Sequence, residues 1–338
     1  MINLHKLYTY PIKSLRETPI SGAVVTKHGF LYDRRFMILK VHREDDNTRR
    51  YENMHVAFFP EMVLFSTDIT FPSDDGTEPG KVHVTFNPPG GGSPRTLNIP
   101  LLPDVSGLDT LKVVMHSSPT DAYDMGAPYN DWFSGCFGYD VVLAYLGENL
   151  RPVLMTGPLK GQTNGSWLSS ITSLLGSAVD ETEAITFADC APFLVVSETS
   201  LKDVSARLSD GEQMDITKFR PNVVVEGAES KWEEDFWAEI MLGDVKLNAA
   251  QNCVRCQSIN IDYATGKLGK DEAGKVFKLM QKDRRIDAGH KYSPVFGRYC
   301  FLAPGDDHKR IAVGDEVKVL RRNSEHTVFD WPGLGSNK

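Results

Sequence analysis

The stretch Asn252–Gln257, NCVRCQ, lies about two thirds of the way along the chain and places two thiols three residues apart. The residues that follow, Gln257 to Tyr263 (QSINIDY), alternate polar and apolar, which predicts a half-buried strand. A redox Cys-x-x-Cys pair would instead open a helix, and a zinc site would need two more ligands at a recognisable spacing. Arg255 brings positive charge close to Cys256, so we expect it to favour the thiolate, which binds metals or attacks as a nucleophile. The alternative is that one or both cysteines are small core residues.

Composition limits the class of protein. A length of 338 residues suggests about two domains, and 41% hydrophobic with 24% charged residues is ordinary for a soluble globular chain. The net charge of −8 argues against general nucleic-acid binding, and five unevenly spaced cysteines do not form a secreted disulfide framework. No apolar run approaches the ~18 residues of a membrane span. Met1 leads almost directly into a strand-like segment, so we expect no presequence or anchor and, by default, a cytoplasmic location.

Short β-branched and aromatic runs dominate the secondary structure expected from the sequence. They predict strands at 2–11, 23–26, 34–41, 62–66, 82–86, 141–145, 193–197, 219–225, 241–247, 299–303 and 315–320. Helical spacing predicts helices at 129–137, 200–208 and 273–282, with Ser197 as the cap before the second. Residues 155–182 are polar and rich in glycine and serine, which indicates a domain boundary and a mobile loop. Many short strands with few helices predict an α+β, mainly β, protein built on a barrel.

Common catalytic motifs are missing. The segment Gly269–Lys275 has Walker spacing up to its lysine, but Val276 stands where a Ser or Thr is required. No Gly-x-Gly-x-x-Gly turn, Gly-x-Ser-x-Gly elbow or His-Glu-x-x-His helix is present. The nine histidines are scattered, and we expect each to be a surface or core residue and not a ligand. The sequence therefore contains no nicotinamide or flavin fingerprint.

Basic residues recur beside turns and strand ends. Lys13-Ser14, Asp33-Arg34 and Phe219-Arg220-Pro221-Asn222 are far apart in sequence, and singly each is typical of a solvated or salt-bridged cation. Together with Arg255 they offer the groups that a buried phosphate and a polar heterocycle need, because the guanidinium fork binds phosphate oxygens in pairs. A thiolate nearby suits a soft, thiophilic metal.

At these residues the sequence resembles the MOSC-domain molybdenum proteins, specifically the amidoxime-reducing component type. The matching segments occur in the family's order and span residues 2–320, and the combination is specific although each motif alone is weak. They are 10–14 (YPIKS), 31–34 (LYDR), 192–198 (PFLVVSE), 219–222 (FRPN), 253–256 (CVRC), 293–297 (SPVFG) with Tyr299, and 313–315 (VGD). The stretch Glu52–Phe59 (ENMHVAFF) departs from the family pattern.

The resemblance implies a MOSC-type β-barrel domain preceded by a β-rich N-terminal MOSC-N domain. We accordingly expect an N-terminal domain at 1–154, the MOSC domain at 155–325 and a flexible tail at 326–338. It also implies the molybdenum cofactor, a pyranopterin phosphate whose dithiolene holds the metal, with Cys256 as the protein ligand and Cys253 as a structural neighbour. The cofactor contacts carried over are Lys13, Ser14, Arg34, Arg220, Asn222, Arg255 and Tyr299.

By the same resemblance we expect a molybdenum-containing oxidoreductase that reduces N-hydroxylated compounds, with Cys256 as its catalytic metal ligand. Asp189 and Asn222 are the polar candidates for catalytic proton delivery, and the alternative is that a buried aspartate is a satisfied structural group. The resemblance implies that electrons come from cytochrome b5, which NADH-cytochrome b5 reductase reduces. It also implies that the protein can associate with the mitochondrial outer membrane. Two alternatives stay open: a MOSC protein that carries sulfur or delivers cofactor without turnover, and a non-catalytic protein with buried thiols.

Overall fold

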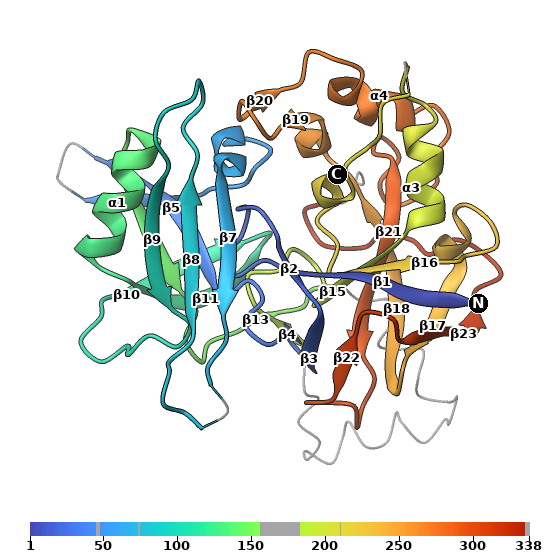
Figure 1. The fold of residues 1–338 in the computed structure, drawn as a ribbon, viewed down its shortest axis with the longest axis horizontal. Coiled ribbons are helices and arrows are strands. Elements are labelled where there is room, and N and C mark those ends of the chain that lie inside the picture. The colour runs from blue at the N-terminus through green and yellow to red at the C-terminus, as the bar shows by residue number, and fades with distance from the viewer. Residues whose placement is uncertain (45–47, 74, 156–182, 210, 335–338) are drawn as a thin grey trace.

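The computed structural model describes residues 1–44, 48–73, 75–155, 183–209 and 211–334. Figure 1 shows two β-rich bodies side by side, one built from residues of the N-terminal half and one mainly from the C-terminal half. The first strand crosses to the second body, so a single cut of the chain does not separate the two.

The C-terminal body is a barrel of seven strands. It closes because β1 pairs with both β16 and β23, and all its neighbouring strands are antiparallel except β15 and β16. In the order of pairing the strands are β16 (Val223–Glu226), β15 (Phe193–Ser197), β21 (Val295–Leu302), β18 (Val245–Val254), β17 (Trp237–Leu242), β23 (Glu316–Arg322) and β1 (Ile2–Thr9).

The strand β15 shows why an uninterrupted apolar run fits this barrel. Phe193 and Val195 pack in one core cluster, while Leu194 and Val196 pack in another with α3 (Glu198–Ser205). Side chains alternate across a strand, so FLVVS is buried on both faces. The side chain of Ser197 accepts a hydrogen bond from the Thr199 backbone N–H, as its predicted capping role requires.

The N-terminal body contains two sheets and one helix. A five-stranded sheet runs β10 (Thr110–Met115), β11 (Ser118–Asp124), β12 (Val141–Tyr145), β5 (Phe36–Arg43) and β6 (Arg49–Asn53). A three-stranded sheet runs β7 (Phe65–Thr70), β8 (Lys81–Phe86) and β9 (Arg95–Pro100). The helix α1 (Ala127–Phe137) covers them through Trp132 and Phe133, which pack on the fully buried Phe65.

Smaller elements complete the chain. The short strands are β2 (Thr18–Ile20), β3 (Gly22–Thr26), β4 (Gly29–Phe30), β13 (Arg151–Pro152), β14 (Ala184–Ile185), β19 (Ile261–Asp262), β20 (Lys267–Leu268) and β22 (Arg310–Ala312). The short helices are α4 (Val276–Met280) and the 3-10 turns η1 (Pro60–Leu64), η3 (Ile216–Phe219), η4 (Glu233–Phe236), η5 (Gln257–Asn260) and η6 (Ala273–Lys275). Within the described ranges, no helix is long and apolar enough to cross a membrane.

The predicted fold class is confirmed, and the strands at 141–145 and 193–197 have the predicted bounds. The predicted strand at 241–247 is wrong, because Gly243 and Asp244 turn the chain between β17 and β18. The predicted strand at 257–263 is mostly the turn η5, in which Ser258, Ile259 and Asn260 are buried in succession, so burial does not follow the polar–apolar alternation of the sequence. The strands β6, β9, β10 and β11 carry polar faces and were not predicted.

The division at residue 154/155 stays a prediction, because the polar stretch 156–182 lies outside the described residues. The expected flexible tail at 326–338 also stays a prediction, and its described part, residues 326–334, makes several contacts with the rest of the protein. Phe329 and Trp331 are buried there, and the Trp331 Nε1–H donates to the carbonyl oxygen of His116 at 2.8 Å. A large aromatic residue with a satisfied N–H anchors this segment onto the body of the protein.

Candidate functional site

A cavity of about 340 Å³ collects every site residue that the sequence predicted. Its walls come from both bodies and from segments far apart in the chain. Nine of its lining residues were predicted: Lys13, Ser14, Arg34, Asp189, Arg220, Asn222, Arg255, Cys256 and Tyr299. What each of them does remains a prediction, whereas their convergence is a feature of the fold.

Three of these residues have left-handed backbone conformations. Ser14, Arg34 and Arg220 have φ angles of 69°, 50° and 57°, in three turns that meet at the cavity. Non-glycine residues adopt this region at a cost, and such outliers cluster at ligand sites because surrounding contacts hold them there. Arg34 lies just before β5 and Arg220 just before the barrel strand β16, so the two turns place both guanidinium groups near the starts of these strands.

The two arginines share one aromatic surface. The guanidinium carbons of Arg34 and Arg220 each lie 4.5 Å from the ring centre of Tyr10. Arg34 also donates to Asp33, to Asn222 Oδ1 at 3.2 Å and to the Arg220 carbonyl oxygen at 3.3 Å. Arg34 is therefore part of the framework of the site as well as a source of positive charge.

Two buried guanidinium nitrogens at this cavity have no acceptor among the described residues. They are Arg220 Nη2 and Arg255 Nε. The other contacts of these groups are satisfied, since Arg220 Nη1 donates to the Leu15 carbonyl oxygen and Arg255 Nη2 to that of Phe219, at 2.8 and 2.7 Å. Buried N–H groups without a partner are costly, so the site fits a ligand that brings anionic or carbonyl oxygens.

The two cysteines of the NCVRCQ stretch differ in environment. Cys253 is buried on β18, where Arg255 Nη1 lies 2.7 Å from its sulfur, and burial raises the pKa of its thiol. Cys256 follows β18, is exposed to the cavity and has its sulfur 3.0 Å from the Ser258 hydroxyl oxygen. We expected Arg255 to act on Cys256, but its direct contact is with Cys253. The accessible thiol is Cys256.

Asp189 lies between the two bodies, and its side chain is 55% exposed because it faces the open cavity. Lys13 donates to its Oδ1, and His116 Nε2 lies 3.4 Å from the same oxygen. Burial alone would raise the pKa of Asp189, but the Lys13 charge and the His116 contact hold it well below its usual value. Burial lowers the pKa of Lys13, against the opposite effect of Asp189.

Three histidines of this cavity, His55, His116 and His290, were not predicted as site residues. His55 follows β6 and His116 occupies the β10–β11 turn, and their rings stack with centres 5.2 Å apart. Neither belongs to a motif, and His55 lies in the stretch that departs from the family pattern. Only the packing of the two loops brings them together, so no local sequence signal was available for them.

Asn222 and Tyr299 are held by protein contacts. Asn222 Oδ1 accepts hydrogen bonds from Arg34 and from the Leu194 N–H, and its Nδ2 donates to the Tyr8 carbonyl oxygen. These bonds tie β1 to β15 and favour a positioning role, while proton donation by Asn222 stays a prediction. Tyr299, on β21, is buried, which raises the pKa of its phenol well above the usual value.

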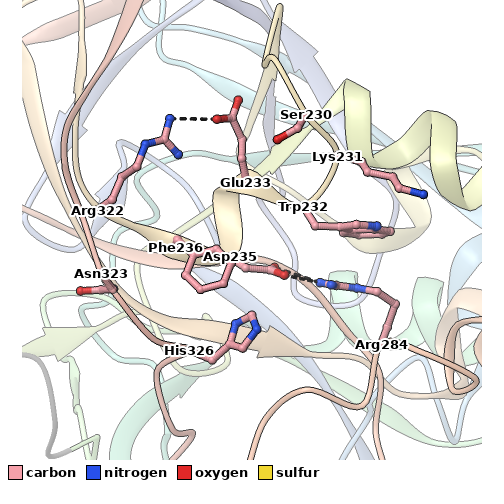
Figure 2. Close-up of a pocket in the computed structure, with 10 residues that line it drawn as sticks. All are labelled: Ser230, Lys231, Trp232, Glu233, Asp235, Phe236, Arg284, Arg322, Asn323 and His326. Atoms are coloured by element: carbon pink, nitrogen blue, oxygen red, sulfur yellow. Dashed lines mark hydrogen bonds and ion pairs between the residues drawn. The ribbon is translucent and has the colours of Figure 1, made fainter.

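A second hollow lies away from this cavity (Figure 2), around η4 and the end of β23. Its charged groups are paired: Arg284 with Asp235 at 2.7 Å, Arg322 with Glu233 at 2.8 Å, and Lys231 with Asp203 outside the hollow. Arg284 additionally stacks over Trp232 at 3.8 Å. Because these charges are mutually satisfied, the hollow offers little to a charged ligand, and the chemistry concentrates in the first cavity.

Comparison with known proteins agrees with this geometry. Residues 1–140 match the MOSC N-terminal beta barrel domain, and residues 182–318 match the MOSC domain. The mitochondrial amidoxime-reducing component 1 of Mus musculus is 28% identical over 325 residues, which cover 93% of this chain and 81% of the relative. The mitochondrial amidoxime reducing component 2 of Macaca fascicularis is 27% identical over 325 residues, covering 92% and 82%. The component 1 of Homo sapiens is 35% identical over 143 residues, covering 41% and 40%. The chain thus belongs to the MOSC-domain proteins, and it resembles the amidoxime-reducing components over most of its length.

Proposed function

We propose that this protein is a molybdenum-cofactor-dependent reductase of N-hydroxylated compounds such as amidoximes and hydroxylamines. The observation that carries the proposal is the single cavity in which an accessible thiol, a lysine and three arginines meet, two of them with buried N–H groups that lack an acceptor. The names of the relatives support the same class of substrate.

The residues present fit a pyranopterin phosphate with a metal. Arg34, Arg220 and Arg255 supply charge-assisted donors for phosphate and pterin oxygens, and Lys13 and Ser14 add further donors. Cys256 is the accessible soft ligand for the metal. When bound, the molybdenum cofactor supplies the centre that takes up the oxygen of the N–OH group.

The reaction consumes two electrons and two protons as the N–O bond breaks, and it yields the amine or amidine and water. With its low pKa, Asp189 is a carboxylate at neutral pH. It can therefore accept hydrogen bonds from the N–H groups of a substrate. It can pass on a proton only after receiving one from a neighbour such as Lys13, whose ammonium group already contacts it.

The electrons must come from outside the chain, because the sequence carries no nicotinamide or flavin motif. We propose a one-electron haem donor, cytochrome b5, re-reduced by NADH-cytochrome b5 reductase, as the similarity to amidoxime-reducing components implies. Association with the mitochondrial outer membrane is a further proposal. The names of the relatives support mitochondria in general, and the outer membrane is implied by the family resemblance alone.

The exposed thiol also favours a second function, a MOSC protein that carries sulfur or delivers cofactor. A persulfide on Cys256 would be accessible to a partner, whereas one on the buried Cys253 would not. Cyanolysis of purified protein separates the two functions, because a carrier releases thiocyanate from sulfane sulfur and lacks stoichiometric molybdenum.

The test of the proposed function compares two matched variants made in cofactor-competent cells. We expect about one molybdenum per wild-type chain by elemental analysis, following single-thiolate ligation. Cys256→Ala should lose the metal and all reduction of benzamidoxime, while Cys253→Ala should retain much of both. Equal behaviour of the two variants, or dependence on Cys253 alone, would show that the ligand assignment is wrong.

A further inference from the structure

The cavity contains a cluster that the proposed cofactor contacts do not use. One nitrogen of His55, one nitrogen of His116 and one carboxylate oxygen of Asp189 all lie within 4.8 Å of one another. The histidines come from the N-terminal body and Asp189 from the loop that leads to β15. Two imidazoles and one carboxylate are a common ligand set for zinc and related transition metals in proteins.

The backbones that carry these side chains are fixed. Arg151 is buried and donates to the carbonyl oxygens of Met115 and Ala188, the residues just before His116 and Asp189. The His116 carbonyl oxygen accepts from Trp331, and that of His55 accepts from the Phe58 and Phe59 N–H groups. The cluster is therefore held by the fold and is not a chance meeting of mobile loops.

The protonation states suit a metal. Burial, followed by the charge of Lys13, lowers the pKa of His55 to about 4, so its imidazole is neutral at pH 7 with a lone pair free to coordinate. The lowered pKa of Asp189 keeps its carboxylate ionised. Metals bind deprotonated ligands, so His55 and Asp189 need little or no proton loss before coordination.

The geometry is close to what coordination needs. In a tetrahedral zinc site with ~2.0–2.1 Å bonds, neighbouring ligand atoms lie about 3.3 Å apart. The separation of 3.4 Å between His116 Nε2 and Asp189 Oδ1 already matches this value. The His55 ring, stacked on that of His116 at an interplanar angle of 24°, must turn to bring its nitrogen to the same point.

We propose that His55, His116 and Asp189 form a binding site for one divalent transition-metal ion of the zinc and cobalt class, separate from the Cys256 centre. Lys13 competes for this site because its ammonium group contacts the same carboxylate. The competing charge selects among metals. Ions that gain strength from imidazole nitrogen, such as Zn²⁺ and Co²⁺, can displace it, whereas the oxygen-preferring Mg²⁺ and Ca²⁺ cannot.

The experiment titrates the full chain with Co²⁺ and measures absorbance between 500 and 650 nm. The protein carries Cys256→Ser, so that this thiol cannot bind the added ion. We expect one Co²⁺ per chain and displacement by Zn²⁺, but no displacement by Mg²⁺. His55→Gln and His116→Gln should each weaken binding at least 10-fold. Lys13→Met should strengthen it, since it removes the competing charge. Circular dichroism of each variant checks folding, and His55→Ala replaces His55→Gln if the latter unfolds.

The matched control is His42→Gln, because His42 and Glu52 form an imidazole–carboxylate pair at 2.7 Å outside the cavity. This variant should bind like the parent. Three outcomes would overturn the site. Co²⁺ binding could survive both cluster substitutions, His42→Gln could reduce binding as much as they do, or the parent could bind no Co²⁺. None of these readouts depends on molybdenum or on reductase turnover, so failure of this proposal is distinguishable from failure of the proposed function.

Discussion

At the residue scale, Arg34 and Arg220 both have the sequence context of a predicted cofactor contact, but the structure gives them different contacts. Arg34 donates to Asp33, Asn222 and the Arg220 carbonyl oxygen, so removing it costs stability as well as ligand binding. Arg220 has one contact to a carbonyl oxygen and one buried nitrogen without an acceptor. Arg220 is consequently the better probe of cofactor binding.

We expect Arg220→Asn to lower cofactor occupancy while the Tm of the cofactor-free protein hardly moves. Asparagine tolerates the left-handed backbone, so the change removes charge without adding strain. Hydrogen bonds to charged groups contribute roughly 1.5–3 kcal/mol, which corresponds to about 10- to 100-fold weaker binding. Molybdopterin content and melting curves measure the two effects. His308→Asn, at an exposed left-handed residue, is the control, and full occupancy in Arg220→Asn would show that this arginine serves the fold alone.

A buried carboxyl outside the cavity gives a pH-dependent prediction. Glu234 is fully buried, its Oε2 accepts from the Ser200 hydroxyl at 2.8 Å, and its Oε1 has no described partner. Burial, followed by the charge of Asp235, raises its pKa from 4.5 to about 8. Because the folded state holds this proton more tightly, stability declines as pH rises from about 4.5 to about 8 and the loss is complete above that.

Glu234→Gln removes this penalty. We expect the variant to gain stability over wild type as pH rises, by an amount on the order of a few kcal/mol at pH 9 and by little at pH 4.5. Thermal melts across that range measure it, with the half-exposed Glu226→Gln as control. A difference between variant and wild type that does not change with pH would mean that Glu234 does not titrate in this window.

At the scale of elements, the segment from 326 to 334 closes the site. Trp331 is 1% exposed and bonds to the turn that carries His116, while Phe329 and Leu334 line the cavity. The Phe329 N–H donates to Asp287 Oδ1 and Gln251 donates to Asp330, at 2.9 and 2.6 Å. The segment thus links the barrel to the N-terminal body.

We expect Trp331→Ala to destabilise the protein by about 3–5 kcal/mol, because it empties a packed site and frees the His116 carbonyl. Chemical denaturation measures the loss, and Val328→Ala, three residues away and 53% exposed, should change stability little. If the two substitutions behave alike, this segment does not pack in solution as it does here.

At the scale of the whole molecule, the proposed reductase function requires this acidic protein to dock an electron donor. Four basic residues that lie close together in sequence, Lys282, Arg284, Arg285 and Lys291, are candidates for a basic docking patch. The structure removes Arg284 from it, because this side chain is 5% exposed and pairs with Asp235. Lys282 and Arg285 remain exposed, close in sequence to His290 and Ser293 at the cavity. Transient redox complexes are small, typically under ~1,200 Å², so two cations can influence docking.

We expect Lys282→Glu with Arg285→Glu to slow turnover with the haem donor and to leave activity with a small artificial reductant intact. Added salt should slow the turnover of the wild-type protein with the haem donor, because salt screens the charges of the docking patch and the Debye length is ~8 Å at 0.15 M. Lys112→Glu, which reverses a 92%-exposed charge on β10, is the control for net charge. Equal losses with both reductants would place the damage in the active site.

Much of this architecture is local and could be predicted. Apolar runs such as 141–145 and 193–197 indicate that their strands are buried, and the nine residues singled out from the sequence and its family resemblance line one cavity. Local patterning failed at 257–263, where the turn η5 buries three consecutive residues, and at 241–247, where a turn at Gly243 separates two strands.

The tertiary structure alone decided the contacts between distant segments. It directed Arg255 to Cys253 and left Cys256 open to the cavity. It also buried Trp331 and brought His55 and His116 to Asp189. Hydrophobic periodicity and residue propensity describe which side of one segment is buried, so they predict individual helices and strands. Which loops meet depends on how two bodies pack, a long-range property that no single segment encodes.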